Sequence, residues 1–174
     1  AVLFAESDEL LVTTPDAGGL AAFVAAFMAD DARTAVRCIG YELHHDMTAG
    51  ELPLDASKPI LLQRKRWHRN ALYDKALLTK APLTWSLGFH TCTESVAQDA
   101  RLLLVHLHKY DFQRYLDRHE ARAKYKHAES AIADGLNTHY RTSGGALVAQ
   151  YMASACAPLE AVPAWVAETA LPGI

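Results

Sequence analysis

The hydrophobic pattern changes its period several times along the chain and predicts a mixture of helices and strands. Residues 15–30 follow Thr14, and a Thr14-Pro15 pair is typical of a helix start. They repeat apolar side chains at spacings of three and four, which predicts a helix. Asp111 can cap a second, long helix, and residues 146–155 predict a short third one. Short apolar runs predict strands at residues 2–4, 10–12, 35–43, 60–62, 72–79, 83–89 and 102–107.

The remaining segments complete the predicted architecture. Leu102–Leu107 is almost entirely apolar, so we expect this strand in the centre of the sheet. Residues 46–59, with one glycine and two prolines, predict a loop. Strands mixed with helices predict an α/β domain in which a mixed β-sheet is flanked by helices, but the pattern leaves the strand order open.

Composition narrows the class of protein. The 174 residues are 51% hydrophobic and 21% charged, which is typical of one globular domain. A net charge of −3 gives no general attraction to nucleic acid. The three cysteines lie far apart without a CxxC pair, which argues against disulfides or a thiolate zinc site and favours the reducing cytoplasm. The sequence shows no signal peptide, and no apolar run approaches the roughly 20 residues of a transmembrane helix.

The first predicted strand runs into the acidic segment Glu6-Ser7-Asp8-Glu9. Carboxylates at positions i and i+2 after a strand can converge on one Mg²⁺ or Mn²⁺ ion that a phosphate also coordinates. A solvated acidic turn is the alternative, and this segment alone leaves both interpretations open.

Histidines recur at the ends of predicted strands. His90 follows Gly88-Phe89, where glycine lets the backbone pass close to a ligand. His106 and His108 lie at i and i+2 of one strand and point to the same face, as a metal-binding pair or as buried, hydrogen-bonded side chains. In His44-His45 the two side chains point to opposite faces, so at most one of them serves the same site.

Positive charge is concentrated in residues 63–80, "QRKRWHRNALYDKALLTK". These cations could neutralise a diphosphate while Trp67 or Tyr73 stacks on a ring, and a solvated basic loop is the alternative. The sequence contains no P-loop, no GxGxxG and no GxSxG, so those nucleotide-binding and hydrolase motifs receive no support.

The order of these motifs resembles that of a known family. "ESDELL" is followed by "GYELHHD", "LYDKALL", "GFHT", "LLLVHLHKYDFQRYLDRH" and "GLNTHY". This order is similar to that of bacterial family-2-type glycosyltransferases of the GT-A fold, over nearly the whole chain to about residue 142. The resemblance implies a GT-A-like sheet and transfer of a sugar from a nucleotide-diphosphate donor to a hydroxyl acceptor. It also implies assistance by Mn²⁺ or Mg²⁺ and inversion of the anomeric centre.

The resemblance also implies roles for individual residues. Glu6 stands where the family has an aspartate, and Leu10 where it has a phenylalanine. The nucleotide-binding half that precedes the acidic motif in this family is missing, so we expect residues 1–174 to form one domain that is the C-terminal part of a longer enzyme. The implied site consists of metal ligands Asp8 and His90, substrate-binding Glu6, Lys75, His106 and His108, and the candidate bases Asp46 and Asp74.

Two other functions fit the same residues. In a metal-dependent hydrolase, Asp8, His90, His106 and His108 would form an all-protein cage for zinc or manganese. In a non-catalytic binding domain the same fold would bind a partner without chemistry. The two enzymes differ in metal behaviour, because a transferase should bind manganese more tightly with nucleotide present, whereas a hydrolase should retain the metal alone.

Overall fold

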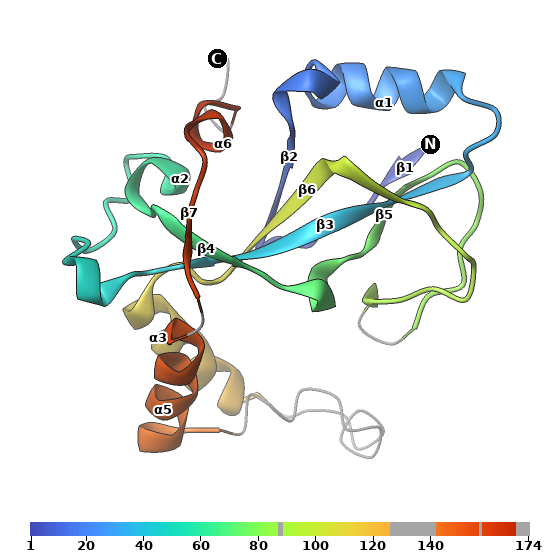
Figure 1. Ribbon diagram of the computed structural model, residues 1–174. Helices are drawn as coiled ribbons and strands as arrows, with labels where there is room; N and C mark the ends of the chain where they lie inside the picture. Colours follow the sequence, from blue (N-terminus) through green and yellow to red (C-terminus); the bar gives the residue numbers. More distant parts are fainter. Residues whose placement is uncertain (87–88, 126–141, 157, 170–174) are drawn as a thin grey trace.

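The computed structural model describes residues 1–86, 89–125, 142–156 and 158–169, which form an α/β fold around a mixed, curled β-sheet (Figure 1). The two longest strands, β3 and β6, run parallel, and β2 pairs antiparallel with β6. β5 and β4 pair antiparallel with the first and the last residues of β3, and they carry β1 and β7 respectively. The strands are β1 (Val2–Leu3), β2 (Glu9–Thr13), β3 (Ala35–His44), β4 (Arg66–Arg69), β5 (Ala76–Thr79), β6 (Gln98–Lys109) and β7 (Glu160–Ala161).

Helices flank this sheet, with α1 at one end of it and α3 beside α5 at the other (Figure 1). No helix among the described residues is long and apolar enough to cross a lipid bilayer. The α-helices are α1 (Leu20–Ala29), α2 (Ile60–Gln63), α3 (Phe112–Ala123), α5 (Gly144–Ala155) and α6 (Ala164–Thr169), and the 3-10 helices are η1 (Pro15–Ala17), η2 (Met47–Ala49) and η3 (Ala71–Tyr73).

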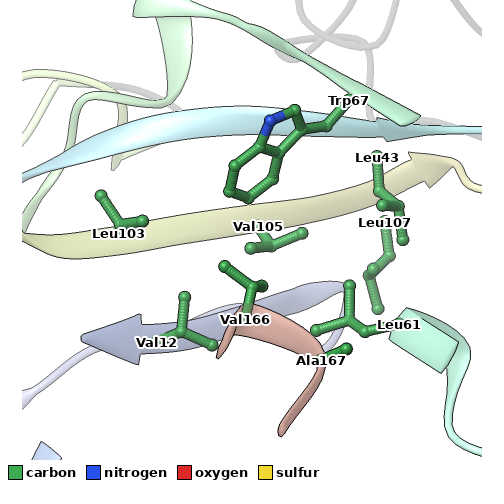
Figure 2. Close-up of a cluster of buried hydrophobic side chains, with 9 residues drawn as sticks. All are labelled: Val12, Leu43, Leu61, Trp67, Leu103, Val105, Leu107, Val166 and Ala167. Atoms are coloured by element: carbon green, nitrogen blue, oxygen red, sulfur yellow. The ribbon is translucent and has the colours of Figure 1, made fainter. Parts of the chain in front are cut away.

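One face of the sheet carries an apolar core that is covered by α2 and α6 (Figure 2). Side chains alternate along a strand, so every second residue of β3 and β6 reaches this core. Trp67 of β4 joins it and is 3% exposed. The residues of this core are Val12, Leu43, Leu61, Trp67, Leu103, Val105, Leu107, Val166 and Ala167.

The opposite face changes from apolar to polar along the same strands. In the first half of β3 and the middle of β6 it carries Cys38 and Leu104, which pack with Phe23 and Phe27 of α1. The next positions on this face are Glu42 and His44 on β3 and His106 and His108 on β6, and Glu42 lies opposite His106 in the parallel register. The sequence therefore places a buried polar region directly beside a hydrophobic core, under α3 and α5.

Several predicted elements are confirmed, and others are wrong. The helices after Asp111 and near residue 146 are present, as is the central strand at 102–107. The helix predicted for 15–30 is divided at Gly18-Gly19 into η1 and α1, and of the strand predicted for 72–79 only 76–79 is a strand, since 71–73 form η3. The strand expected at 60–62 is the helix α2. For 83–89, the described residues form only an isolated bridge between Trp85 and Cys92. Residues 63–80, for which the sequence left a diphosphate-binding segment and a solvated basic loop open, contain the strand β4, which the sequence analysis missed.

Candidate functional site

The acidic turn, residues 6–9, joins two strands that lie on different sides of β3. β1 pairs with β5, whereas β2 pairs with β6, so the chain between them crosses over the sheet. The Leu107 amide donates to the Asp8 carbonyl at 2.8 Å, and the Glu6 amide donates to the Glu9 carboxylate at 2.9 Å. These bonds fix the turn against the polar region of the sheet.

Lys75 holds the acidic turn in place through two ion pairs. Its side chain is fully buried, and its ammonium group donates to the carboxylates of Glu6 and Glu9. Glu9 is equally buried, whereas the Glu6 side chain is 44% exposed. Burial by itself would lower the pKa of Lys75, but the hydrogen bonds that its ammonium group donates to Glu6 and Glu9 outweigh it and raise that pKa, so the lysine is charged.

Asp8, His106 and His108 bring three potential metal-ligand atoms within 4.8 Å of one another. His106 Nε2 lies 3.8 Å from Asp8 Oδ2. His106 Nδ1 lies 3.1 Å from both oxygens of Glu42, and because a carboxylate only accepts, Nδ1 carries the hydrogen and Nε2 faces Asp8. In metal sites, a histidine ligand usually donates its other ring N–H group to a carboxylate in this way, and the carboxylate fixes the orientation of the ring.

Glu42 and Tyr73 both contact His106 of this group. Glu42 is 1% exposed and also accepts the backbone N–H groups of His108 and Lys109 at 3.2 Å. The Tyr73 ring stacks on His106 with centroids 3.9 Å apart. Burial raises the pKa of Tyr73 strongly, and the charge of Glu42 adds to this effect, so the phenol stays protonated.

A glycine makes room for this stack. A Cβ atom at Gly40 would lie 2.5 Å from Tyr73 Cβ and 2.6 Å from the Tyr73 carbonyl carbon. Real Cβ atoms essentially never approach so closely, so only glycine at this position of β3 lets η3 bring Tyr73 over the sheet.

Helix α3 closes the group from the other side. Arg118 Nη1 donates to Asp8 Oδ2 at 2.9 Å and to His108 Nδ1 at 3.2 Å. Since Nδ1 of His108 accepts, its Nε2 carries the hydrogen and donates to His119 Nε2 at 3.2 Å. Burial, followed by the neighbouring charges of His106 and Arg118, lowers the pKa of His108 to about 2, so it is the neutral form that a metal requires.

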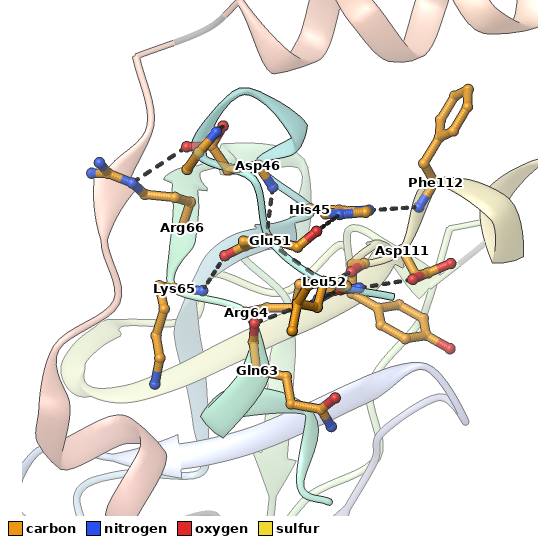
Figure 3. Close-up of polar contacts among 12 residues, drawn as sticks. His45, Asp46, Glu51, Leu52, Gln63, Arg64, Lys65, Arg66, Asp111 and Phe112 are labelled. Carbon is orange, nitrogen blue, oxygen red and sulfur yellow. Dashed lines mark hydrogen bonds and ion pairs between the residues drawn. The ribbon is translucent and has the colours of Figure 1, made fainter. Parts of the chain in front are cut away.

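A buried ion pair holds the start of α3 in place (Figure 3). Arg64 is 1% exposed, and it donates to Asp111 at 2.8 Å and to the Leu52 carbonyl at 3.0 Å. Asp111 also caps α3 by accepting from the Arg114 amide at 3.0 Å. The predicted cap at Asp111 is thus confirmed, and Arg64, which the sequence suggested as a phosphate ligand or a solvated side chain, is buried against it.

The two candidate bases carry structural hydrogen bonds. Asp46 caps η2 by accepting from Thr48 and Ala49, and it lies 3.6 Å from Arg66 (Figure 3). The hydrogen bond from the Thr48 hydroxyl is the main cause that lowers the pKa of Asp46.

Asp74 accepts from the Gly40 amide at 2.9 Å and pairs with Arg69 at 2.5 Å. Like Asp46, it therefore has a structural role, while its assignment as a base stays a prediction.

His90 lies beside the group without joining its hydrogen bonds. Its Nδ1 is 2.9 Å from the Leu72 carbonyl, and its ring is 6.1 Å from that of Tyr73. Tyr73 stacks on His106, and His106 lies beside Asp8. His90 and Asp8 therefore lie on either side of this pair of rings and are not on opposite sides of the molecule. Whether His90 binds a metal stays a prediction, as does the role of Lys75 toward a substrate.

We call this whole group the polar cluster. The sequence analysis anticipated Glu6, Asp8, Lys75, His106 and His108 as site residues, and the fold brings all five together. It missed the partners that orient them. The polar cluster consists of Glu6, Asp8, Glu9, Glu42, Tyr73, Lys75, His106, His108, Arg118 and His119.

Some of the missed residues left a signal in the sequence. Glu42 stands two residues before His44 and shares a strand face with Val36, Cys38 and Gly40, so its carboxylate is expected on the His44 face of β3. His119 follows Tyr115 by four positions and Arg118 follows it by three, which are the spacings of one helical face. Nothing local indicated that these residues meet Asp8, which is 110 positions away from Arg118.

Comparisons with known proteins found no relative of this chain. No protein-family model matches the sequence, and searches of curated proteins and of solved structures found no match.

Proposed function

We propose that this chain belongs to a metal-dependent glycosyltransferase with a GT-A-like sheet, which transfers a sugar from a nucleotide-diphosphate donor to a hydroxyl acceptor. The supporting observation is that the segments carrying the family resemblance, far apart in sequence, contribute to one polar cluster or lie against it. Of the quoted segments, "GLNTHY" lies outside the described residues. The contributions are Asp8 from "ESDELL", Glu42 from "GYELHHD", Lys75 from "LYDKALL", His106 and Arg118 from the β6–α3 segment, and His90 from "GFHT" beside Tyr73.

Asp8, His106 and His108 would hold the cation. One carboxylate and two imidazoles suit Mn²⁺ better than Mg²⁺, which prefers oxygen ligands alone. When bound, the ion would stabilise the negative charge that develops on the leaving diphosphate. The charge of the cluster agrees with a cation, because four carboxylates (Glu6, Asp8, Glu9 and Glu42) face two permanently charged groups (Lys75 and Arg118).

The other residues of the cluster position these ligands. Lys75 and Glu9 hold the acidic turn over the sheet, and Glu42 orients His106. Glu6 is the exposed partner of Lys75, so a donor phosphate that displaced Glu6 would reach the ammonium group. The base that takes the acceptor proton is proposed to be Asp46 or Asp74, and inactivation by only one of Asp46→Asn and Asp74→Asn would identify it.

Manganese binding with and without a nucleoside diphosphate tests the proposal. We expect Mn²⁺ to bind weakly alone and more tightly with UDP or GDP. We also expect the protein to release nucleoside diphosphate from nucleotide sugars. Asp8→Asn should lose both modes of Mn²⁺ binding and this release. Equal manganese affinity in Asp8→Asn and in the unchanged protein would refute the proposed metal site. Full activity of Asp8→Asn in the longest available form of the protein would instead favour a binding domain.

One observation favours a metal-dependent hydrolase as the second candidate. Three of the four side chains expected for an all-protein metal cage lie within 4.8 Å. A hydrolase would retain zinc or manganese through dialysis without nucleotide, whereas the transferase would lose it. Both candidates fit the reducing cytoplasm that we propose as the location, since Cys38, Cys92 and Cys156 are free thiols.

A further inference from the structure

A single nitrogen of Arg118 is hydrogen-bonded to two of the three candidate ligand residues, Asp8 and His108. Nη1 donates to Asp8 Oδ2 at 2.9 Å and to His108 Nδ1 at 3.2 Å. An N–H group that donates to a lone pair prevents a metal ion from using the same lone pair. In this arrangement the guanidinium therefore stands in the place of the cation.

We propose that Arg118 is a built-in counter-ion that exchanges with the divalent cation. In the metal-free protein its charge compensates Asp8, and the cation binds only when the guanidinium moves away from Asp8 and His108. The inference rests on the proposed metal site and adds to it the residue that controls occupancy.

The surroundings of Arg118 allow such a movement. Its side chain is 23% exposed on α3, so the guanidinium can rotate toward solvent without disturbing the helix. Arg64 shows the contrasting case, because it is 1% exposed and tied to Asp111 and to the carbonyls of Leu52 and Tyr110. Arg64 is therefore a fixed structural residue, whereas Arg118 can leave its partners Asp8 and His108.

Electrostatics supplies the reason for exchange. Without Arg118 or a metal, Lys75 would be the one lysine or arginine left in the polar cluster as defined above, against its four carboxylates. With a divalent ion bound between Asp8 and the histidines, the guanidinium would face a like charge a few ångströms away and be repelled. A released arginine can bind phosphate through two parallel hydrogen bonds, so it becomes available to the diphosphate of the proposed donor.

Titration with Mn²⁺ alone, followed by the electron paramagnetic resonance signal of the free ion, tests the exchange. We compare the unchanged protein with Arg118→Gln, with Asp8→Asn, and with Arg114→Gln, which removes the same charge from an exposed position of the same helix. Arg118→Gln should bind Mn²⁺ at least about tenfold more tightly, the factor expected from removing even one of the two competing charge-assisted hydrogen bonds. Arg114→Gln should bind like the unchanged protein.

The outcomes separate this inference from the proposed function. Unchanged or weaker binding by folded Arg118→Gln, with binding still lost in Asp8→Asn, would overturn the exchange and leave the metal site intact. Binding that survives in Asp8→Asn would overturn the metal site itself. A second measurement needs no variant: phenylglyoxal should modify Arg118 of the unchanged protein faster when Mn²⁺ is present, with no acceleration at Arg114, and an unchanged rate at Arg118 would also refute the exchange.

Discussion

Replacing Lys75 by methionine tests whether the ion pairs of Lys75 with Glu6 and Glu9, which we call the Lys75 triad, hold the acidic turn. The change keeps most of the side-chain volume and removes the charge, which leaves the fully buried Glu9 carboxylate without its cation. Breaking a buried pair by removing one partner costs about 3–5 kcal/mol. The hydrogen bond from the Glu6 amide to the Glu9 carboxylate stays available, so the loss reports the electrostatic interaction rather than the turn alone.

Urea unfolding at pH 7, followed by circular dichroism, measures this loss. With a slope of about 2 kcal/mol per molar urea, a destabilisation of 4 kcal/mol lowers the midpoint by about 2 M. Lys58→Met is the matched control, because Lys58 pairs with Asp55 while its side chain is 65% exposed. An exposed pair of this kind contributes about 0–1 kcal/mol, so the control midpoint should hardly change.

The double variant Lys75→Met/Glu9→Gln gives the decisive result. Removing both charges abolishes the uncompensated carboxylate, so the double variant should lose less than the sum of the two single variants, with a coupling of about 2 kcal/mol or more. If Lys75→Met behaves like Lys58→Met, or if the two single losses simply add, the triad does not stabilise the turn and the reasoning is refuted.

Three other predictions follow from single contacts. Gly40→Ala should destabilise the protein by about 1–3 kcal/mol and shift the absorbance of Tyr73, because its Cβ would lie 2.5 Å from Tyr73 Cβ; an unchanged thermal midpoint would contradict this. Burial lowers the pKa of His44 to about 4 from 6.5, so its stabilising effect is complete above pH 6.5 and is lost as pH falls toward 4, by about 3 kcal/mol in total. The variant His44→Gln should lack this loss, and equal slopes of unfolding free energy against pH for both proteins would refute it. Burial raises the pKa of the Cys38 thiol to about 12, so Ellman's reagent should modify the exposed Cys156 first and Cys38 only on unfolding, as mass spectrometry of the labelled peptides would show.

The fold could be predicted where a local pattern determines the element. The apolar run at 102–107 is confirmed as a central strand, and Asp111 is confirmed as a helix cap. The strand expected at 60–62 is wrong because a run of three apolar residues has no period that separates strand from helix. β4 was missed because arginines and histidine surround Trp67, and the core contact of that one side chain outweighs the polar composition.

The candidate site could be predicted only in part for a different reason. His106 and His108 share a face because strands have a period of two, and this part of the prediction is confirmed. The meeting of His106 with Glu42 depends on the parallel register of β3 and β6, which no short segment encodes. The partnership of Arg118 with Asp8 likewise depends on where α3 docks. Ligands can therefore be read from spacing, whereas the groups that orient or compete with them cannot.

The parallel pairing of β3 with β6 has a consequence for how the molecule reaches its native state. Glu42 and His106 are 64 positions apart, and Asp8 is 110 positions from Arg118, so the polar cluster forms only after several long loops have closed. Contacts of such high sequence separation slow folding. A ligand that recognises only the completed cluster would shift the balance toward the native chain, and its occupancy would report the final step of assembly.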